Sequence, residues 1–187
     1  MDELGAQLRQ HALLEGDFVL RSGRRSRYYL DKYRFETRPD LLGPLGDRLA
    51  AAVQRFEPAT VRLAGPALGA VALAAAASLS SGLPFLIVRQ SAKTYGTGQR
   101  VEGPYEQGEL ACLIEDVVTS GGALTEAVAA LREVGLEVRQ AVCVVDREEG
   151  GSDALARVGV RLRALYTGGE LLPRRDEPAT RMVEPVR

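Results

Sequence analysis

The 187-residue chain carries 24 lysines and arginines against 25 aspartates and glutamates, for a formal net charge of −1. This length is typical of one domain whose core needs no disulfide or metal, and the near-neutral charge gives no global signal for nucleic-acid binding. The longest apolar stretch, residues 64–79, is interrupted by Gly65, Pro66 and Gly69, which makes it a poor membrane span. We therefore expect neither nucleic acid nor a membrane as partner.

Residues 1–187 are interpreted as a single domain, with 1–37 mostly a small N-terminal hood, 38–165 an α/β core and 166–187 a C-terminal segment. The first ten residues lack the apolar core of a secretory signal, so we expect a cytoplasmic protein. Cys112 and Cys143 lie in apolar runs and are interpreted as buried thiols. His11 lies in a helical pattern and does not suggest a catalytic triad. Lys32 and Lys93 are the only lysines, which singles out both for attention.

The first 35 residues predict a helix followed by a hairpin. Leucines recur at helical spacing from residue 4 to residue 14. Residues 18–20 and 28–30 have the composition of short strands and flank the turn at 22–26. Such a hairpin is expected to pack over one end of a sheet and to enclose a ligand there.

From residue 39 onward the pattern alternates between helix and strand. We expect helices at 39–56 and 68–79, a further one ending at 134, strands at 60–64, 84–88, 110–114 and 138–145, and a last pair of elements within 154–165. This alternation predicts right-handed βαβ units, and hence an α/β fold with a central, mostly parallel sheet flanked by helices. Ligands of such sheets bind at the carboxyl ends of the strands.

Residues 110–128, LACLIEDVVTSGGALTEAV, join an apolar strand, two acids, a hydroxyl and glycine turn, and a helical pattern. Glu115 and Asp116 are expected to end the strand, where two carboxylates suit vicinal hydroxyls or a Mg²⁺ held through water. Residues 119–122 place hydroxyls and open backbone N–H groups at a helix N-terminus, which favours a dianionic phosphate. The alternative is an ordinary strand, turn and capped helix, which explains each part alone. The combination favours a phosphorylated sugar.

Two further segments suit phosphate groups. The polar segment at 88–103 is longer than a typical connection, and Arg89, Lys93 and Tyr95 in it suit a pyrophosphate that gains negative charge as it leaves. The alternative is a solvated loop whose charges have no role. The glycine- and proline-rich turn at 63–69 also offers backbone N–H groups, although packing explains it equally well.

Arg147 follows a buried strand within the segment AVCVVDREEGG. A guanidinium group there suits bidentate recognition of a planar, anionic base. The alternative is a surface salt bridge with Asp146, Glu148 or Glu149.

Together these segments resemble the orotate phosphoribosyltransferase family, a branch of the type I phosphoribosyltransferases. LACLIEDVVTSGGALTEAV resembles their binding signature for 5-phosphoribosyl-1-pyrophosphate (PRPP). KTYGTGQRVEG at 93–103, VVDREEGG at 144–151 and FVLRSGRRSRYYLD at 18–31 resemble the orotate branch rather than its purine relatives. The resemblance covers residue 18 to about residue 165.

The resemblance implies a type I phosphoribosyltransferase fold and a Mg²⁺-dependent transfer of ribose 5-phosphate from PRPP to N1 of orotate, which gives orotidine 5'-monophosphate and pyrophosphate for UMP biosynthesis. It also implies a homodimer in which the Lys93 loop closes over the neighbouring site. Lys93 and Asp116 are the implied catalytic residues. Residues implied to bind PRPP are Arg21, Ala67, Leu68, Gly69, Arg89, Lys93, Tyr95, Glu115, Asp116, Val117, Val118, Thr119, Ser120, Gly121, Gly122 and Ala123. Those implied to bind orotate are Tyr29, Leu30, Thr119 and Arg147, and no residue is implied as a direct metal ligand.

Four positions depart from the family pattern. Gln90 stands where the family commonly has a second lysine, and Thr94 replaces a frequent aspartate. Arg21 occupies a position often held by lysine, and Glu115 replaces the aspartate of many relatives. Two alternatives therefore stay open, a phosphoribosyltransferase for another base and a PRPP-sensing regulator that binds nucleic acid.

Overall fold

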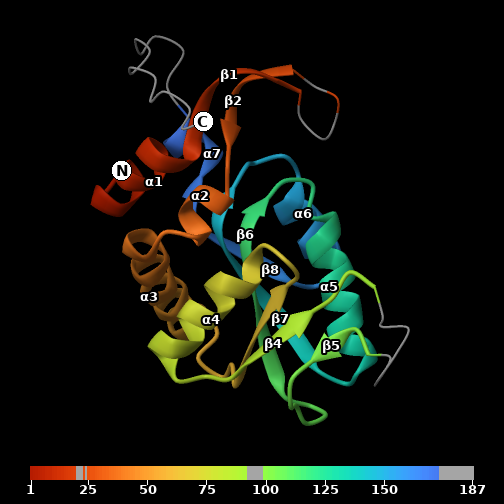
Figure 1. Ribbon diagram of the computed structural model, residues 1–187. Coiled ribbons are helices and arrows are strands. Elements are labelled where there is room, and N and C mark those ends of the chain that lie inside the picture. The colour runs from red at the N-terminus through yellow and green to blue at the C-terminus, as the bar shows by residue number, and fades with distance from the viewer. Residues whose placement is uncertain (20–22, 24, 92–98, 173–187) are drawn as a thin grey trace.

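The computed structural model describes residues 1–19, 23, 25–91 and 99–172. A six-stranded sheet of order β5-β4-β3-β6-β7-β8 forms its centre, and a two-stranded hairpin stands over the carboxyl end of β6 (Figure 1). The strands are β1 (Leu13–Val19), β2 (Arg25–Leu30), β3 (Arg62–Pro66), β4 (Phe85–Val88), β5 (Val101–Glu102), β6 (Leu110–Val118), β7 (Glu137–Asp146) and β8 (Arg161–Thr167). The helices are α1 (Glu3–Ala12), α2 (Tyr33–Glu36), α3 (Pro39–Phe56), α4 (Ala70–Ser81), α5 (Gly122–Glu133), α6 (Gly151–Arg157) and α7 (Gly168–Leu171).

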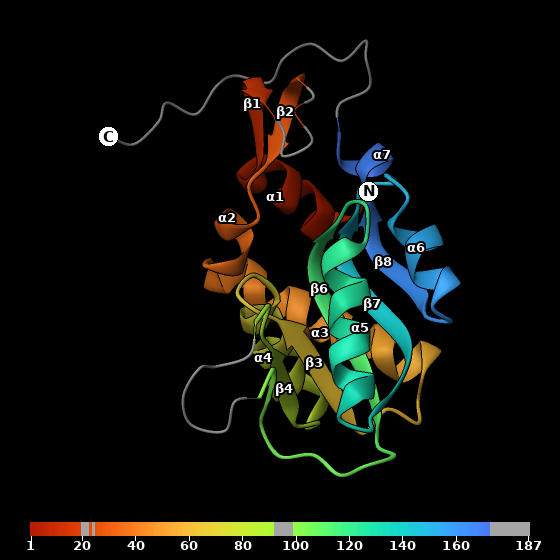
Figure 2. The same ribbon diagram turned by 90° about the vertical axis from the view of Figure 1, so that its right-hand side faces the viewer.

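The central sheet is parallel except for β5, which pairs antiparallel with β4. Successive side chains of a strand point to opposite faces, and the two cores follow that rule. In β6, Cys112 and Ile114 belong to the core shared with α1, α2, α3 and α4, whereas Ala111 and Leu113 belong to the core shared with α5 and α6. Figure 2 shows α5 in front of the sheet and α3 behind it. The predicted α/β architecture, with a mostly parallel sheet flanked by helices, is confirmed.

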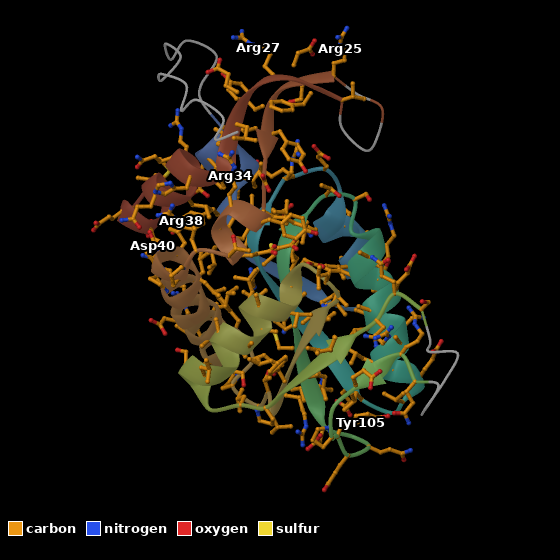
Figure 3. The ribbon with its side chains drawn as sticks, viewed as in Figure 1. Arg25, Arg27, Arg34, Arg38, Asp40 and Tyr105 are labelled. Carbon is orange, nitrogen blue, oxygen red and sulfur yellow. The ribbon has the colours of Figure 1, made fainter. Side chains whose placement is uncertain are left out.

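The hairpin is confirmed as well, and its strands are longer than expected. β1 and β2 pair antiparallel, with Leu13 opposite Leu30 and Val19 opposite Arg25. Leu30 packs against the first core, which anchors the base of the hairpin, while Arg25 and Arg27 point away from the body of the molecule (Figure 3). Each is paired across the hairpin, Arg25 with Asp17 and Arg27 with Glu15.

Three local expectations were wrong. The acid pair does not end its strand, because β6 continues to Val118 and keeps its pairing with β7 through Val117 and Val118. The segment at 88–103 is not all loop, since Val101 and Glu102 return as β5 beside β4. The short helices α2 and α7 were not predicted, because four-residue helices leave almost no periodic pattern.

Candidate active site

The carboxyl ends of β3, β4, β6 and β7 meet at one edge of the sheet. These strands end at Pro66, Val88, Val118 and Asp146. The backbone N–H of Ala67 donates to the carbonyl oxygen of Val88 at 2.8 Å, and that of Arg147 donates to Val118 at 2.9 Å. The segments that follow the strands are therefore fixed to one another, and this edge carries most of the predicted site residues.

The turn after β6 leaves backbone N–H groups available for a ligand. Thr119, Ser120, Gly122 and Ala123 are exposed, while Gly121 is buried with a φ of +80°, a conformation that favours glycine. Among the described residues, no backbone hydrogen bond is donated by residues 119–121, and no side chain caps α5. The first N–H groups of a helix lack partners within it, so this end of α5 is suited to an anion such as phosphate.

The backbone, rather than the side chains, of Val117 and Val118 faces this edge. Val117 packs on the first core and Val118 on the second. Gly151, the first residue of α6, lies so close that a Cβ there would overlap the Val118 side chain. The turn at 119–122 is thus packed closely against the start of α6.

Glu115 and Asp116 are buried within β6, near its carboxyl end. The two residues are 7% and 3% exposed. Glu115 Oε1 accepts from the Asp116 N–H at 3.0 Å, and Asp116 Oδ1 accepts from the Val117 N–H. Asp116 Oδ2 accepts from Lys32 Nζ at 2.6 Å, although the two residues lie 84 positions apart. One lysine from the hood therefore neutralises one acid of the sheet.

A third acid, Glu36 of α2, joins this group. It is 5% exposed, and its Oε1 makes no hydrogen bond to the described residues. Burial, the negative charge of Asp116 and a hydrogen bond to it raise the pKa of Glu36 to about 8. Burial and the Asp116 charge also raise the pKa of Glu115 to about 8. Burial lowers the pKa of Lys32, but its hydrogen bond and attraction to Asp116 outweigh that and raise it.

The turn after β3 lies against the same group. Ala67, Leu68 and Gly69 connect β3 to α4, and Leu68 is 74% exposed. A Cβ at Gly69 would overlap both Asp116 Oδ2 and Lys32 Nζ, so only glycine allows this close approach. Among the described residues, neither Leu68 nor Gly69 donates a backbone hydrogen bond. The turn can therefore present N–H groups to a second anionic group beside Asp116.

Arg89 follows β4 and is held from the other side by β5. Its N–H donates to the carbonyl oxygen of Arg100 at 2.8 Å, and its buried Nε has no partner among the described residues. The two ends of the predicted pyrophosphate loop are thus side by side. Lys93 and Tyr95 in that loop, and Arg21 in the hairpin turn, lie outside the described residues.

The predicted base-binding residues come from two elements. Arg147 follows β7 and pairs with Glu149, with Nη2 to Oε1 at 3.1 Å, and its side chain is 19% exposed. The alternative of a salt bridge is therefore realised with Glu149. Tyr29 of β2 is 42% exposed and stacks obliquely on Phe18, with ring centroids 5.5 Å apart, while Leu30 turns to the core.

The structure adds Lys32 and Glu36 to the predicted set. Both come from the α2 region, which the periodic pattern did not reveal. The one available signal was the rarity of lysine, since Lys32 is one of only two in the chain. No comparable signal marked Glu36, which is one acid among 25.

A family model for the phosphoribosyl transferase domain matches residues 47–160. The orotate phosphoribosyltransferase of Methanocella arvoryzae is 48% identical over 171 residues, which cover 91% of this chain and 96% of that protein. The chain belongs to the orotate phosphoribosyltransferase family. The solved structure of Mycobacterium tuberculosis orotate phosphoribosyltransferase matches with a TM-score of 0.80 at 31% identity, covering 90% of this chain and 97% of that one. The same enzyme in complex with PRPP matches with a TM-score of 0.76 at 28% identity, covering 90% and 96%.

These matches confirm the family resemblance and the type I phosphoribosyltransferase fold. They extend over nine-tenths of the chain, so they include the hood as well as the central sheet. None of the described helices has the length and apolar character that crossing a membrane requires.

Proposed function

We propose that this protein is an orotate phosphoribosyltransferase, which transfers ribose 5-phosphate from PRPP to N1 of orotate and releases pyrophosphate. The product, orotidine 5'-monophosphate, is the precursor of UMP in pyrimidine biosynthesis. The observation that carries this proposal is membership of the orotate branch over 91% of the chain. The open α5 N-terminus beside a buried acid pair supports it, because it offers a phosphate site next to a site for ribose hydroxyls.

In this proposal the 5'-phosphate binds the backbone of residues 119–123, and the ribose hydroxyls face Glu115 and Asp116. The pyrophosphate lies along residues 67–69 and Arg89, and Arg21 faces a phosphate group. Lys93 and Tyr95 close over the site of the neighbouring subunit. Transfer through an oxocarbenium-like state requires little covalent chemistry from the protein. The chain then acts by placing the two reactants and by stabilising charge on the leaving pyrophosphate.

Orotate recognition is assigned to Arg147, Thr119, Tyr29 and Leu30. The orotate carboxylate would replace Glu149 as the partner of the Arg147 guanidinium, because both are carboxylates and a guanidinium can hold one by two parallel hydrogen bonds. Tyr29 offers an exposed aromatic face on the hairpin for the flat ring, with Leu30 fixing the strand beneath it.

Magnesium is proposed to enter with PRPP. Among the described residues, no three histidine, cysteine or acidic side chains form a cluster suited to a metal ion. Mg²⁺ commonly binds substrate phosphates and water with few protein ligands, which fits the turn at 67–69, where Leu68 is exposed and Gly69 lies against Asp116. When bound there, the ion neutralises negative charge on the pyrophosphate.

We further propose a cytoplasmic homodimer in which Lys93 serves the neighbouring site. A subunit-mixing assay tests this arrangement. Lys93→Ala and Asp116→Asn chains, each inactive alone, should regain activity when mixed, because the hybrid dimer then holds one intact site. Mixed chains that stay inactive, although hybrid dimers are isolated, would rule out a shared loop.

The activity itself is tested with PRPP and a panel of bases. Turnover of orotate, with little turnover of adenine, hypoxanthine or uracil, is expected. Turnover of a purine but not of orotate would assign the protein to a different base. PRPP-dependent binding of RNA or DNA without turnover of any base would instead favour a regulator.

A further inference from the structure

Lys32 and Glu36 approach Asp116 from the hood rather than from the sheet. Lys32 immediately precedes α2 and Glu36 ends it, so the two lie one helical turn apart and face the same side. The Lys32 Nζ to Asp116 Oδ2 distance is 2.6 Å, and the Asp116 side chain is 4% exposed. The catalytic acid of the sheet is therefore in contact with a segment that sequence analysis did not associate with it.

Several neighbouring groups surround the contact between Lys32 and Asp116. Lys32 Nζ lies 5.4 Å from the centre of the Tyr33 ring, and the Gly69 backbone leaves no room for a Cβ beside the ion pair. Asp116 Oδ1 is engaged separately by the Val117 N–H. Both oxygens of the carboxylate are thus oriented before any substrate binds.

Stability alone is a poor explanation for this arrangement. Three buried acids share one lysine, and a buried ion pair contributes little net stability once its desolvation is counted. Burial and the Asp116 charge raise the pKa of Glu36 and of Glu115 to about 8. Of the three acids, Asp116 is the one whose carboxylate lies against Lys32.

We propose that Lys32 and Glu36 are positioning residues for the transfer reaction, and that they orient Asp116 so that its remaining acceptor site faces the ribose hydroxyls of PRPP. A carboxylate offers about four lone-pair sites. Lys32, the Val117 N–H and the hydrogen bond with Glu36 occupy three of them, which leaves one for a hydroxyl donor. This inference rests on the proposed function and assigns it two residues outside the family signature.

The test compares Lys32→Met, Lys32→Arg and Glu36→Gln with the wild-type protein. Lys32→Met should lower kcat about tenfold or more and raise KM for PRPP, because a displaced carboxylate no longer fits the ribose. KM for orotate should change little, since Asp116 does not face the base. Lys32→Arg should restore part of the loss because it keeps the charge. Glu36→Gln keeps a hydrogen-bond donor and should lose less than Lys32→Met.

Arg34→Met is the matched control, because Arg34 belongs to the same short helix, is 47% exposed and pairs with Asp31 (Figure 3). It should keep wild-type kinetics. Thermal melts identify any variant that fails to fold, and Lys32→Arg then carries the test. Folded Lys32 variants with wild-type kcat and KM, or an equal loss in Arg34→Met, would overturn the inference.

Failure of the proposed function is separable from failure of this inference. A wild-type protein that does not convert orotate contradicts the function. Calorimetry with PRPP still decides the role of Lys32, because Lys32→Met should bind PRPP more weakly than Arg34→Met does. Equal PRPP affinities in these two variants would contradict the inference whatever base the enzyme uses.

Discussion

The amino and carboxyl ends of strands β3 and β6 differ in how their acidic side chains are paired with cations. At the amino end, Arg62 Nε and Nη2 donate to the two oxygens of Glu109 at 2.6 and 2.8 Å. The Arg62 hydrogen bond and the Glu106 N–H lower the pKa of Glu109 to about 2. At the carboxyl end, Lys32 is the one cation among the described residues that pairs with the group Glu36, Glu115 and Asp116, and the pKa values of Glu36 and Glu115 are raised.

The amino end is a balanced pair that stabilises the ordinary ionised form of its acid. Tyr105, in the loop that leads to Glu109, lies at the end of the molecule opposite the hairpin (Figure 3). The carboxyl end holds excess acid in a buried place, which the protein tolerates only where the charge has another use. The same two strands therefore carry a balanced ion pair at one end and an excess of buried acids at the other.

The largest expected effect is on activity at the carboxyl end. Asp116→Asn should lower turnover about 100-fold or more, because it removes the carboxylate that pairs with Lys32 and that, in the proposed function, binds the ribose hydroxyls. Steady-state kinetics with saturating PRPP and orotate measure the change. Turnover within twofold of wild type would show that Asp116 is not part of the reaction site.

Gly69→Ala should give the next largest loss of activity. Gly69 has an ordinary helical backbone conformation, so alanine adds no backbone strain, but its Cβ would overlap the Asp116–Lys32 pair. Activity should fall about tenfold or more through misplacement of Asp116. Gly43→Ala in α3 is the control, because a Cβ there meets nothing within 4 Å outside its chain neighbours, and it should keep wild-type activity. Equal activity in the two variants would contradict the close approach at Gly69.

Glu109→Gln should lower stability and leave activity unchanged, whereas Asp116→Asn should lower activity. It breaks the bidentate pair with Arg62 at the amino end, so the melting temperature should fall by a few degrees. Kinetic constants should stay at wild-type values because the pair lies far from the ligand edge. A Glu109→Gln protein that melts normally but reacts slowly would reverse the roles assigned to the two ends.

The smallest effects are differences in how stability depends on pH. With raised pKa values, the folded carboxyl-end acids hold protons that the unfolded chain releases above about 4.5, so the unfolding free energy should fall as pH rises from about 4.5 to about 8. Each proton that the folded state retains lowers the unfolding free energy by at most about 1.4 kcal/mol per pH unit. Glu36→Gln should reduce that slope in denaturant titrations. An unchanged slope would show that Glu36 does not keep its proton.

Glu109 should give the opposite pH dependence of the unfolding free energy in the same denaturant titrations. Its lowered pKa adds stability that is present above about 4.5 and lost as pH falls toward about 2. Glu109→Gln should therefore flatten the acid limb, whereas Glu36→Gln flattens the limb between pH 5 and 8. Identical effects of the two variants would remove the distinction between the ends.

Sequence analysis predicted the α/β order, the helix at Pro39–Phe56 and the turn at 119–122 between strand and helix, because each leaves a local pattern of spacing and composition. It was wrong about the end of β6, since pairing with β7 continues the strand through the acid pair. β5 was not predicted, because two residues make no periodic pattern of their own. Their strand geometry comes from pairing with Ile87 and Val88.

The chain by itself thus determined the family, the sheet with its ligand edge, and the residue types that suit a phosphorylated sugar. Tertiary structure alone decided which acid is neutralised, because Lys32 and Asp116 meet across 84 positions. It also brought Glu36 into the same buried space and paired Arg147 with Glu149. Local spacing encodes helices, strands and turns, whereas burial and charge pairing depend on which distant segments the fold packs together.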